Sequence, residues 1–123
     1  MANQILTKLD CSLVIVTLGA FGIVVAFKQD VIQDVMVLEF EAMTGIHPVD
    51  STGAGDCFIG YFIGSLIEYG GLPRVWSEET LLGVLVPSIK MGIVASGLST
   101  LKKGTIVSYP DKNTVLDSLF RMN

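Results

Sequence analysis

The sequence predicts an α/β fold in which helices cover a mainly parallel β-sheet and the functional site lies at the carboxyl ends of the strands. Residues Leu13 to Leu18 form a continuous apolar, β-branched run without alternation, which is typical of a strand buried on both faces. Residues Phe58 to Ile67 instead repeat their apolar positions at helical spacing. The composition, 50% hydrophobic and 16% charged, favours elements that are covered on both sides.

The N-terminal third is predicted to contain the end of a helix and three strands. Gly19 and Gly22, three positions apart, allow a tight turn between the first two strands. The predicted elements are a helix ending over residues 3–9, a turn at residues 10–12, and strands at Leu13–Leu18 (expected to be central), Ile23–Phe27 and Val35–Phe40.

A long helix is predicted after Asp56, and the stretch Tyr69-Gly70-Gly71-Leu72-Pro73 is expected to terminate it. Gly60 and Gly64 are expected to let this helix approach a strand closely. The stripe expected to pack on the sheet consists of Phe58, Ile59, Phe62, Ile63, Leu66 and Ile67.

Two further helices are expected. Ser77, followed by two glutamates, is typical of an N-cap and an acidic first turn, and the helix should run toward Leu98 with a kink or break at Pro87. Asp111 is expected to cap a short amphipathic helix at the C-terminus. Its predicted core face consists of Val115, Leu116, Leu119 and Phe120.

Length and charge exclude several classes of function. A chain of 123 residues predicts one domain, residues 1–123. The net charge of −4 argues against nucleic-acid binding. The apolar runs at 13–27 and 81–98 are too short or are interrupted, so no membrane span is expected. No signal-peptide pattern is present, so a cytoplasmic location is expected.

The cysteines and the single histidine are not expected to carry chemistry. Cys11 and Cys57 form no metal-binding or disulfide pattern, and Cys57 is predicted to be a small core residue. His47 lies in a loop next to a proline and has no partner in the sequence, so it is predicted to be structural.

The most informative stretch runs from Val49 to Asp56, reads V-D-S-T-G-A-G-D, and directly precedes the long apolar helix. Small residues at this point give a turn whose amides converge at a helix N-terminus, where the dipole favours an anion. The predicted anion hole consists of the amides of Gly53, Ala54 and Gly55. Asp56 is predicted to be a general base for a substrate hydroxyl. The alternative is a glycine-rich helix entry in which the dipole merely favours Asp56.

This stretch resembles a signature of the ribokinase-like (PfkB-type) carbohydrate kinases, D-T-T-G-A-G-D-x-F-x-G. The matching residues are Asp50, Thr52, Gly53, Ala54, Gly55, Asp56, Phe58 and Gly60, with Ser51 a mild variant. Two other segments are similar to the family: T-L-G-x-x-G from Thr17 and G-T-x-x-S-Y-P from Gly104. The resemblance implies a ribokinase-like layered α/β/α fold, of which this chain would be the C-terminal portion, closest to ribokinase.

The resemblance also implies an activity: transfer of the ATP γ-phosphoryl group, with Mg²⁺, to a hydroxymethyl group of a sugar or nucleoside, with ribose as the best single candidate. The implied nucleotide-binding residues are Thr17, Gly19, Gly22 and Gly55. A monovalent cation, K⁺, would lie beside Asp50, Thr52, Gly104 and Ser108.

The chain also departs from the family. It lacks the N-terminal sugar-binding region, the lid strands and the N-x-x-E motif. Residues 28–48 are longer than usual, and Ile93 stands where many ribokinases place Asn or His against adenine. Two hypotheses remain: the catalytic part of a sugar kinase, or a truncated, non-catalytic nucleotide-binding or interaction module. A homodimer, or a partner chain that supplies the missing part, is expected.

Overall fold

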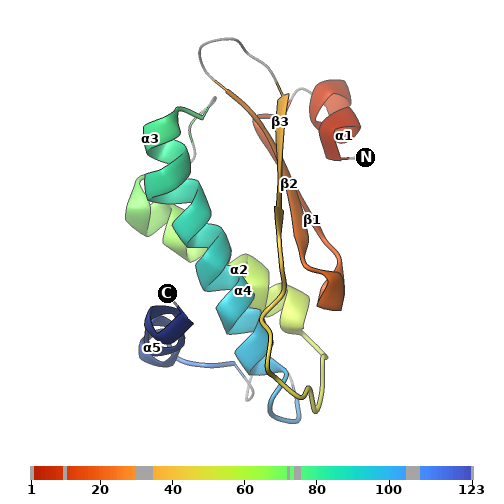
Figure 1. Cartoon of the computed structure of the whole chain (residues 1–123), viewed down its shortest axis with the longest axis vertical. Coiled ribbons are helices and arrows are strands. Elements are labelled where there is room, and N and C mark those ends of the chain that lie inside the picture. The colour runs from red at the N-terminus through yellow and green to blue at the C-terminus, as the bar shows by residue number, and fades with distance from the viewer. Residues whose placement is uncertain are drawn as a thin grey trace.

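A three-stranded sheet lies between one helix on one face and a pair of long helices on the other (Figure 1). The computed structural model describes residues 2–9, 11–29, 35–71, 73, 76–104 and 109–122. In chain order the elements are α1 (Ala2–Leu9), β1 (Leu13–Thr17), η1 (Gly19–Phe21), β2 (Ile23–Lys28), β3 (Val35–Phe40), α2 (Ala54–Tyr69), α3 (Glu78–Thr80), η2 (Leu81–Leu85), α4 (Val86–Ser99) and α5 (Lys112–Met122). The first helix and all three strands lie within one or two residues of their predicted positions. Part of the predicted turn at residues 10–12, Asp10, lies outside the described residues.

The pairing of the strands differs from the prediction. The order is β1-β2-β3 and both pairs are antiparallel, so the expectation of a mainly parallel sheet is wrong for the described strands. Gln29 forms an isolated parallel bridge with Trp76. The reason is the length of the connections: only a short turn separates β1 from β2, whereas parallel neighbours require a crossover of about a dozen residues or more.

The prediction that the first strand is central is also wrong. β2 is the middle strand and is largely buried, whereas β1 lies at an edge of the described sheet and is only half-buried. Both faces of β1 do contact core residues, since Ile15 packs toward the long helices and Val16 toward α1. The apolar run therefore reflects two covered faces, but no described strand covers its outer edge.

The two faces of the sheet support separate cores. Val25 and Phe27 of β2 pack against Phe58 and other residues of α2, η2 and α4 in the main core. On the other face, Ala26 packs against Leu6 of α1. Successive residues of β2 point to opposite faces of the sheet, and both faces are covered. This explains why the sequence of β2 is apolar without alternation.

Only half of the predicted α2 stripe faces the core. Phe58, Phe62 and Leu66 are buried, and the rings of Phe58 and Phe62 stack at 5.8 Å. The isoleucines of the stripe are exposed by about half or more: Ile59 52%, Ile63 48% and Ile67 73%. The helix covers one face of a narrow sheet, so the second row of apolar residues has no described element opposite it.

The glycine that allows close packing of α2 lies on another helix. A Cβ added at Gly60 or Gly64 would meet no atom within 4 Å, so the expected close approach to a strand is absent at these positions. A Cβ at Gly92 of α4 would instead lie 2.6 Å from the Phe58 ring and 3.2 Å from its carbonyl oxygen. Gly92 is therefore the position at which α2 and α4 come together.

Helix ends follow local chemistry. α2 ends at Gly70, as predicted, although Leu72 of the predicted terminator lies outside the described residues. Ser77 caps the next helix as predicted: its hydroxyl accepts the Thr80 amide at 3.1 Å.

The predicted kink or break at Pro87 takes another form, because the helical path continues from α3 to Ser99 through the π-helical turn η2. A wider turn before Pro87 accommodates a residue that cannot donate a backbone hydrogen bond.

The C-terminal helix uses a narrower apolar face than predicted. The Thr114 amide donates to the carboxylate of Asp111 at 2.8 Å, which confirms the predicted cap. Val115 is buried against α4, and Leu119 packs beside it. Leu116 and Phe120 do not face the core and are 38% and 82% exposed, because only one row of α5 reaches α4.

The apolar run from Glu78 to Ser99 is the one described helix that satisfies the length and hydropathy of a membrane span. In its most apolar window, 56% of residues are buried inside the structure. This degree of burial is also what a core helix of a soluble protein shows, so the helix is weak evidence for a span, and the absence of a membrane role stays a prediction.

Candidate functional site

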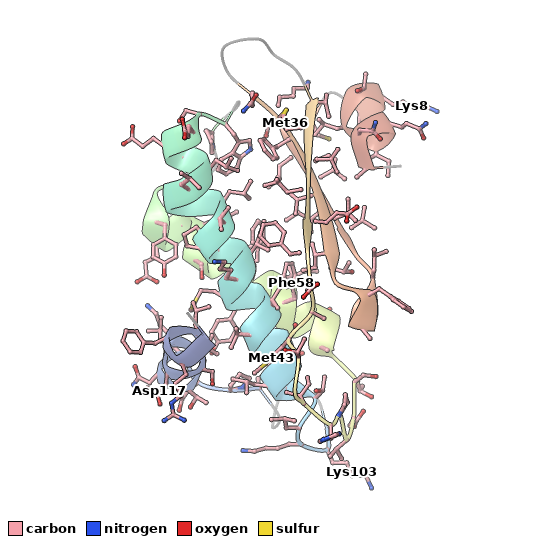
Figure 2. All side chains as sticks on the ribbon, in the orientation of Figure 1. Lys8, Met36, Met43, Phe58, Lys103 and Asp117 are labelled. Carbon is pink, nitrogen blue, oxygen red and sulfur yellow. The ribbon has the colours of Figure 1, made fainter. Side chains whose placement is uncertain are left out.

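The site is built around the turn that leads into α2, and a second segment of the chain holds this turn in place. The amides of Val49 and Asp50 both donate to the carbonyl of Thr100, at 2.7 and 3.0 Å. Thr100 directly follows α4 as its C-cap, so the turn before α2 is tied to the end of α4. Figure 2 shows Lys103, from the segment after α4, at the same end of the molecule.

The Asp50 carboxylate organises the turn. One oxygen accepts the Thr52 hydroxyl at 2.6 Å and the Thr52 amide at 2.9 Å, and the other accepts the Gly104 amide at 3.0 Å. These bonds, the Thr52 hydroxyl first, lower the pKa of Asp50 from 3.8 to about 2. Asp50, Thr52 and Gly104 therefore lie together as expected, whereas Ser108 lies outside the described residues.

Gly53 starts α2 in the left-handed conformation, with φ 78°. Its carbonyl accepts the Cys57 amide at 3.0 Å, the first hydrogen bond of the helix. The Ala54 amide of the predicted anion hole already donates to Ser51 at 3.2 Å. Among the described residues, no acceptor is found for the amides of Gly53, Gly55 and Asp56, so these three are free to bind an anion. Sequence reasoning missed the Asp56 amide, although every helix leaves its first-turn amides unpaired.

Asp56 is the third residue of α2 and its side chain is exposed. It sits in the first turn, where the helix dipole stabilises a carboxylate. The cavity described next is lined by its neighbours Ala54 and Gly55 but not by Asp56 itself. The carboxylate is therefore next to the cavity wall and open to a molecule that approaches from outside it.

A cavity of about 420 Å³ lies beside the turn. All four predicted nucleotide-binding residues line it: Thr17, Gly19, Gly22 and Gly55. Gly22 has φ 97°, and a Cβ there would collide with the Phe40 carbonyl, so this turn requires glycine. Phe58 points from α2 into the space between the long helices and the sheet, and its ring also borders the cavity (Figure 2).

The remaining cavity wall was not predicted. One part comes from the loop after β3 and another from the end of α4: Ala42, Met43, Ile46, Pro48, Ser96, Gly97 and Thr100. Ser96 and Gly97 lie three and four positions after Ile93, and Thr100 lies three positions after Gly97, so helical spacing would have revealed this small-residue face. A Cβ at Gly97 would lie 2.9 Å from Met43, so the loop packs directly on the helix (Figure 2).

The segment that precedes α5 is fixed to α2 at two points. The Tyr109 hydroxyl donates to the Gly53 carbonyl at 2.8 Å, and the Tyr61 hydroxyl donates to the Pro110 carbonyl at 2.6 Å. Lys112, at the start of α5, forms an ion pair at 2.8 Å with Glu68 near the end of α2. The G-T-x-x-S-Y-P resemblance linked this segment to the glycine turn through Gly104 and Ser108, but it assigned no role to Tyr109, which lies 56 positions from Gly53.

Of the cysteines and the histidine, only the core position predicted for Cys57 can be compared with the structure, and it is confirmed. Cys11 and Cys57 are free thiols, and Cys57 is a buried core residue. His47 is exposed in the loop before the turn. Within the described part of the chain, no three acidic, histidine or cysteine side chains gather as a metal site.

Comparison with known proteins extends these observations. Residues 1–112 match the family described as pfkB family carbohydrate kinase. A ribokinase from Mus musculus is 31% identical over 119 residues, which are 97% of this chain and 32% of the relative. A fructokinase from Vibrio alginolyticus is 27% identical over 115 residues, 92% of this chain and 32% of the relative. The chain thus spans about a third of the length of these curated relatives.

The fold is shared with a solved structure, that of Arabidopsis thaliana ribokinase complexed with ribose and ATP. The TM-score is 0.71 and the identity 26%, over 92% of this chain and 30% of that chain. This likeness confirms the predicted ribokinase-like class for a chain that corresponds to part of the longer fold. The free amides of the turn, the cavity beside it and the exposed Asp56 carboxylate therefore belong to a chain with the ribokinase-like fold.

Proposed function

The chain belongs to the pfkB family of carbohydrate kinases, and on this premise we propose that it forms the nucleotide-binding and catalytic part of an ATP-dependent sugar kinase. The reaction is transfer of the ATP γ-phosphoryl group to a hydroxymethyl group of a sugar such as ribose. One observation carries the proposal: the cavity bordered by Thr17, Gly19 and Gly22 also reaches Gly55, whose amide is free, and Asp56 follows directly.

ATP fits this arrangement in size and in chemistry. A cavity of about 420 Å³ falls in the range of about 300–1,000 Å³ that small-molecule sites occupy. Its wall is mostly apolar, with Ile93 and Met43 available to a purine ring. The phosphates would extend toward the Gly55 and Asp56 amides, where the positive end of the α2 dipole stabilises their charge. The adenosine part would occupy the cavity and the γ-phosphoryl group would lie near its mouth.

Asp56 is the proposed general base. Its carboxylate accepts the proton of the sugar hydroxyl while the hydroxyl oxygen attacks the γ-phosphorus. The new oxygen–phosphorus bond forms as the bond to the β-phosphate oxygen breaks, and ADP leaves. The free amides at Gly55 and Asp56 stabilise the negative charge on the transferring group.

The proposed cations would be held differently. Mg²⁺ would be bound by ATP phosphate oxygens and water and would neutralise phosphate charge, since no three-ligand protein site exists among the described residues. K⁺ would lie beside the turn, where the Asp50 carboxylate is kept ionised and Thr52 and Gly104 are close. Ser108 is the fourth proposed member of this K⁺ site.

The sugar-binding part of the site is proposed to come from polypeptide beyond this chain. The chain spans about a third of its relatives, so the remainder could be a partner chain, or a second copy could complete the surface. Two exposed features support this proposal: the outer edge of β1 and the isoleucine row of α2. Neither a membrane nor a nucleic acid is part of the proposal, and the cytoplasm, where ATP is available, is the proposed location.

The test is sugar-dependent ADP formation by the purified chain with ATP, Mg²⁺ and K⁺, using ribose and fructose. Asp56→Ala should lower turnover by about 100-fold or more, the scale of a lost general base. Asp117→Ala is the matched control, because it removes an exposed carboxylate of α5 whose ion pair is confined to that helix. It should leave turnover unchanged.

The other outcomes separate the hypotheses. ATP binding without turnover would mean that the chain is a nucleotide-binding part that requires the sugar-binding polypeptide proposed above. Loss of both ATP binding and turnover in a folded chain would contradict the kinase assignment for this chain. An equal loss of turnover in Asp56→Ala and in Asp117→Ala would remove Asp56 from the mechanism.

A further inference from the structure

Tyr109 connects the C-terminal segment to the first residue of the glycine turn. Its hydroxyl donates to the Gly53 carbonyl oxygen at 2.8 Å. Its ring is partly buried and packs against a core cluster that includes Cys57 and Met91. The phenol is therefore held by packing, and its hydroxyl is directed at one backbone atom of the proposed phosphate site.

That backbone atom belongs to a peptide unit on which the site depends. The Gly53 carbonyl and the Ala54 amide lie in one plane, so whatever fixes one orients the other. At one end of the plane, the carbonyl accepts both Tyr109 and the Cys57 amide; at the other, the Ala54 amide donates to Ser51 at 3.2 Å. Both ends of the first peptide unit of α2 are therefore fixed by hydrogen bonds.

Gly53 makes this restraint necessary. With φ 78° it occupies a conformation that glycine adopts as easily as many others, and because glycine has no Cβ, nothing within the residue holds the backbone there. The residue also provides no N-cap side chain for the helix. The next two peptide units carry the free amides of Gly55 and Asp56, and their direction follows from that of the first.

We propose that Tyr109 is a positioning residue for phosphoryl transfer: its hydroxyl fixes the first peptide unit of α2 and thereby aims the Gly55 and Asp56 amides at the phosphoryl group. This inference rests on the proposed function of the site. It adds a residue from outside the glycine motif, contributed by the last segment of the chain.

The protonation state of Tyr109 suits this role. Partial burial raises the pKa of the phenol, and the negative charge of Asp56 raises it further. The hydroxyl therefore keeps its proton at neutral pH and can donate to the carbonyl throughout the working range of a kinase.

The test compares Tyr109→Phe with Tyr61→Phe. Each substitution removes one hydroxyl that donates to a carbonyl and leaves the aromatic ring in place, but the Tyr61 bond ends at Pro110, away from the turn. Three properties are measured for the full chain: kcat and KM for ribose, the affinity for ATP, and the hydrogen exchange of backbone amides by NMR.

For Tyr109→Phe we expect the Ala54 and Cys57 amides to exchange about three- to tenfold faster, the scale of one lost neutral hydrogen bond. ATP affinity should fall by a similar factor, and kcat should fall by about tenfold with the KM for ribose unchanged. Tyr61→Phe should remain within about twofold of the parent chain in all three properties.

Two results would overturn the inference. Unchanged exchange at Ala54 and Cys57 in Tyr109→Phe would show that the hydroxyl does not restrain the turn. Equal effects in both variants would mean that docking of the C-terminal segment, and not the Gly53 bond, matters. Exchange and ATP affinity can be measured even if the parent chain has no turnover, so failure of the proposed kinase activity and failure of this inference are distinguishable.

Discussion

Replacing Gly92 by alanine tests the closest contact between the two long helices. The added Cβ would lie 2.6 and 2.7 Å from two ring carbons of Phe58 and 3.2 Å from its carbonyl oxygen. The ring cannot swing away freely, because Phe58 is only 4% exposed and stacks on Phe62. Either the helices separate or the ring moves into the neighbouring cavity.

The expected magnitude is the difference between two terms. Overpacking a buried site costs about 1–3 kcal/mol of unfolding free energy. Alanine in place of glycine in a helix interior stabilises by about 1 kcal/mol. Because a backbone atom as well as the ring is in contact, we expect the upper part of the range and a net destabilisation of Gly92→Ala by about 1–2 kcal/mol.

The matched control is Gly64→Ala, at a helical glycine with no atom within 4 Å of an added Cβ. It should be more stable than the parent chain by about 1 kcal/mol. Urea unfolding can be followed by the fluorescence of Trp76, the single tryptophan, which is fully buried in the same core as Phe58. Gly92→Ala should also bind ATP more weakly, since Phe58 borders the cavity. A Gly92→Ala chain as stable as Gly64→Ala would refute the packing described here.

Two predictions concern the turn itself. The pKa of Asp50 is lowered from 3.8 to about 2, so its stabilising effect is present above pH 4 and is lost as the pH falls toward 2. Urea midpoints measured across this window should therefore decline less steeply for Asp50→Asn than for the parent chain, and parallel curves would contradict this. Gly53→Ala forces a Cβ into the left-handed region at φ 78°, which should cost about 1–2 kcal/mol. It should also weaken ATP binding, and calorimetry that shows unchanged affinity would show that the turn tolerates the change.

Much of the local structure was predictable from the sequence because its causes are local. The Ser77 hydroxyl and the Asp111 carboxylate cap their helices with atoms a few residues away. The glycine turn before α2 was likewise recognisable, because small residues before an apolar helical repeat leave amides unpaired. The family motifs then linked this turn to Thr17 and Gly104, and the structure places both nearby.

The sequence by itself determined which segments are strands and helices and where the glycine turn before α2 begins, since periodicity and capping act over a few residues. Only the tertiary structure decided what faces each element. Periodicity identified an apolar side of α2, but not that Ile63 would be exposed while Phe58 would meet Gly92. The hydrogen bond from Tyr109 to Gly53 likewise joins residues far apart in the chain, and such pairings depend on how the whole chain packs.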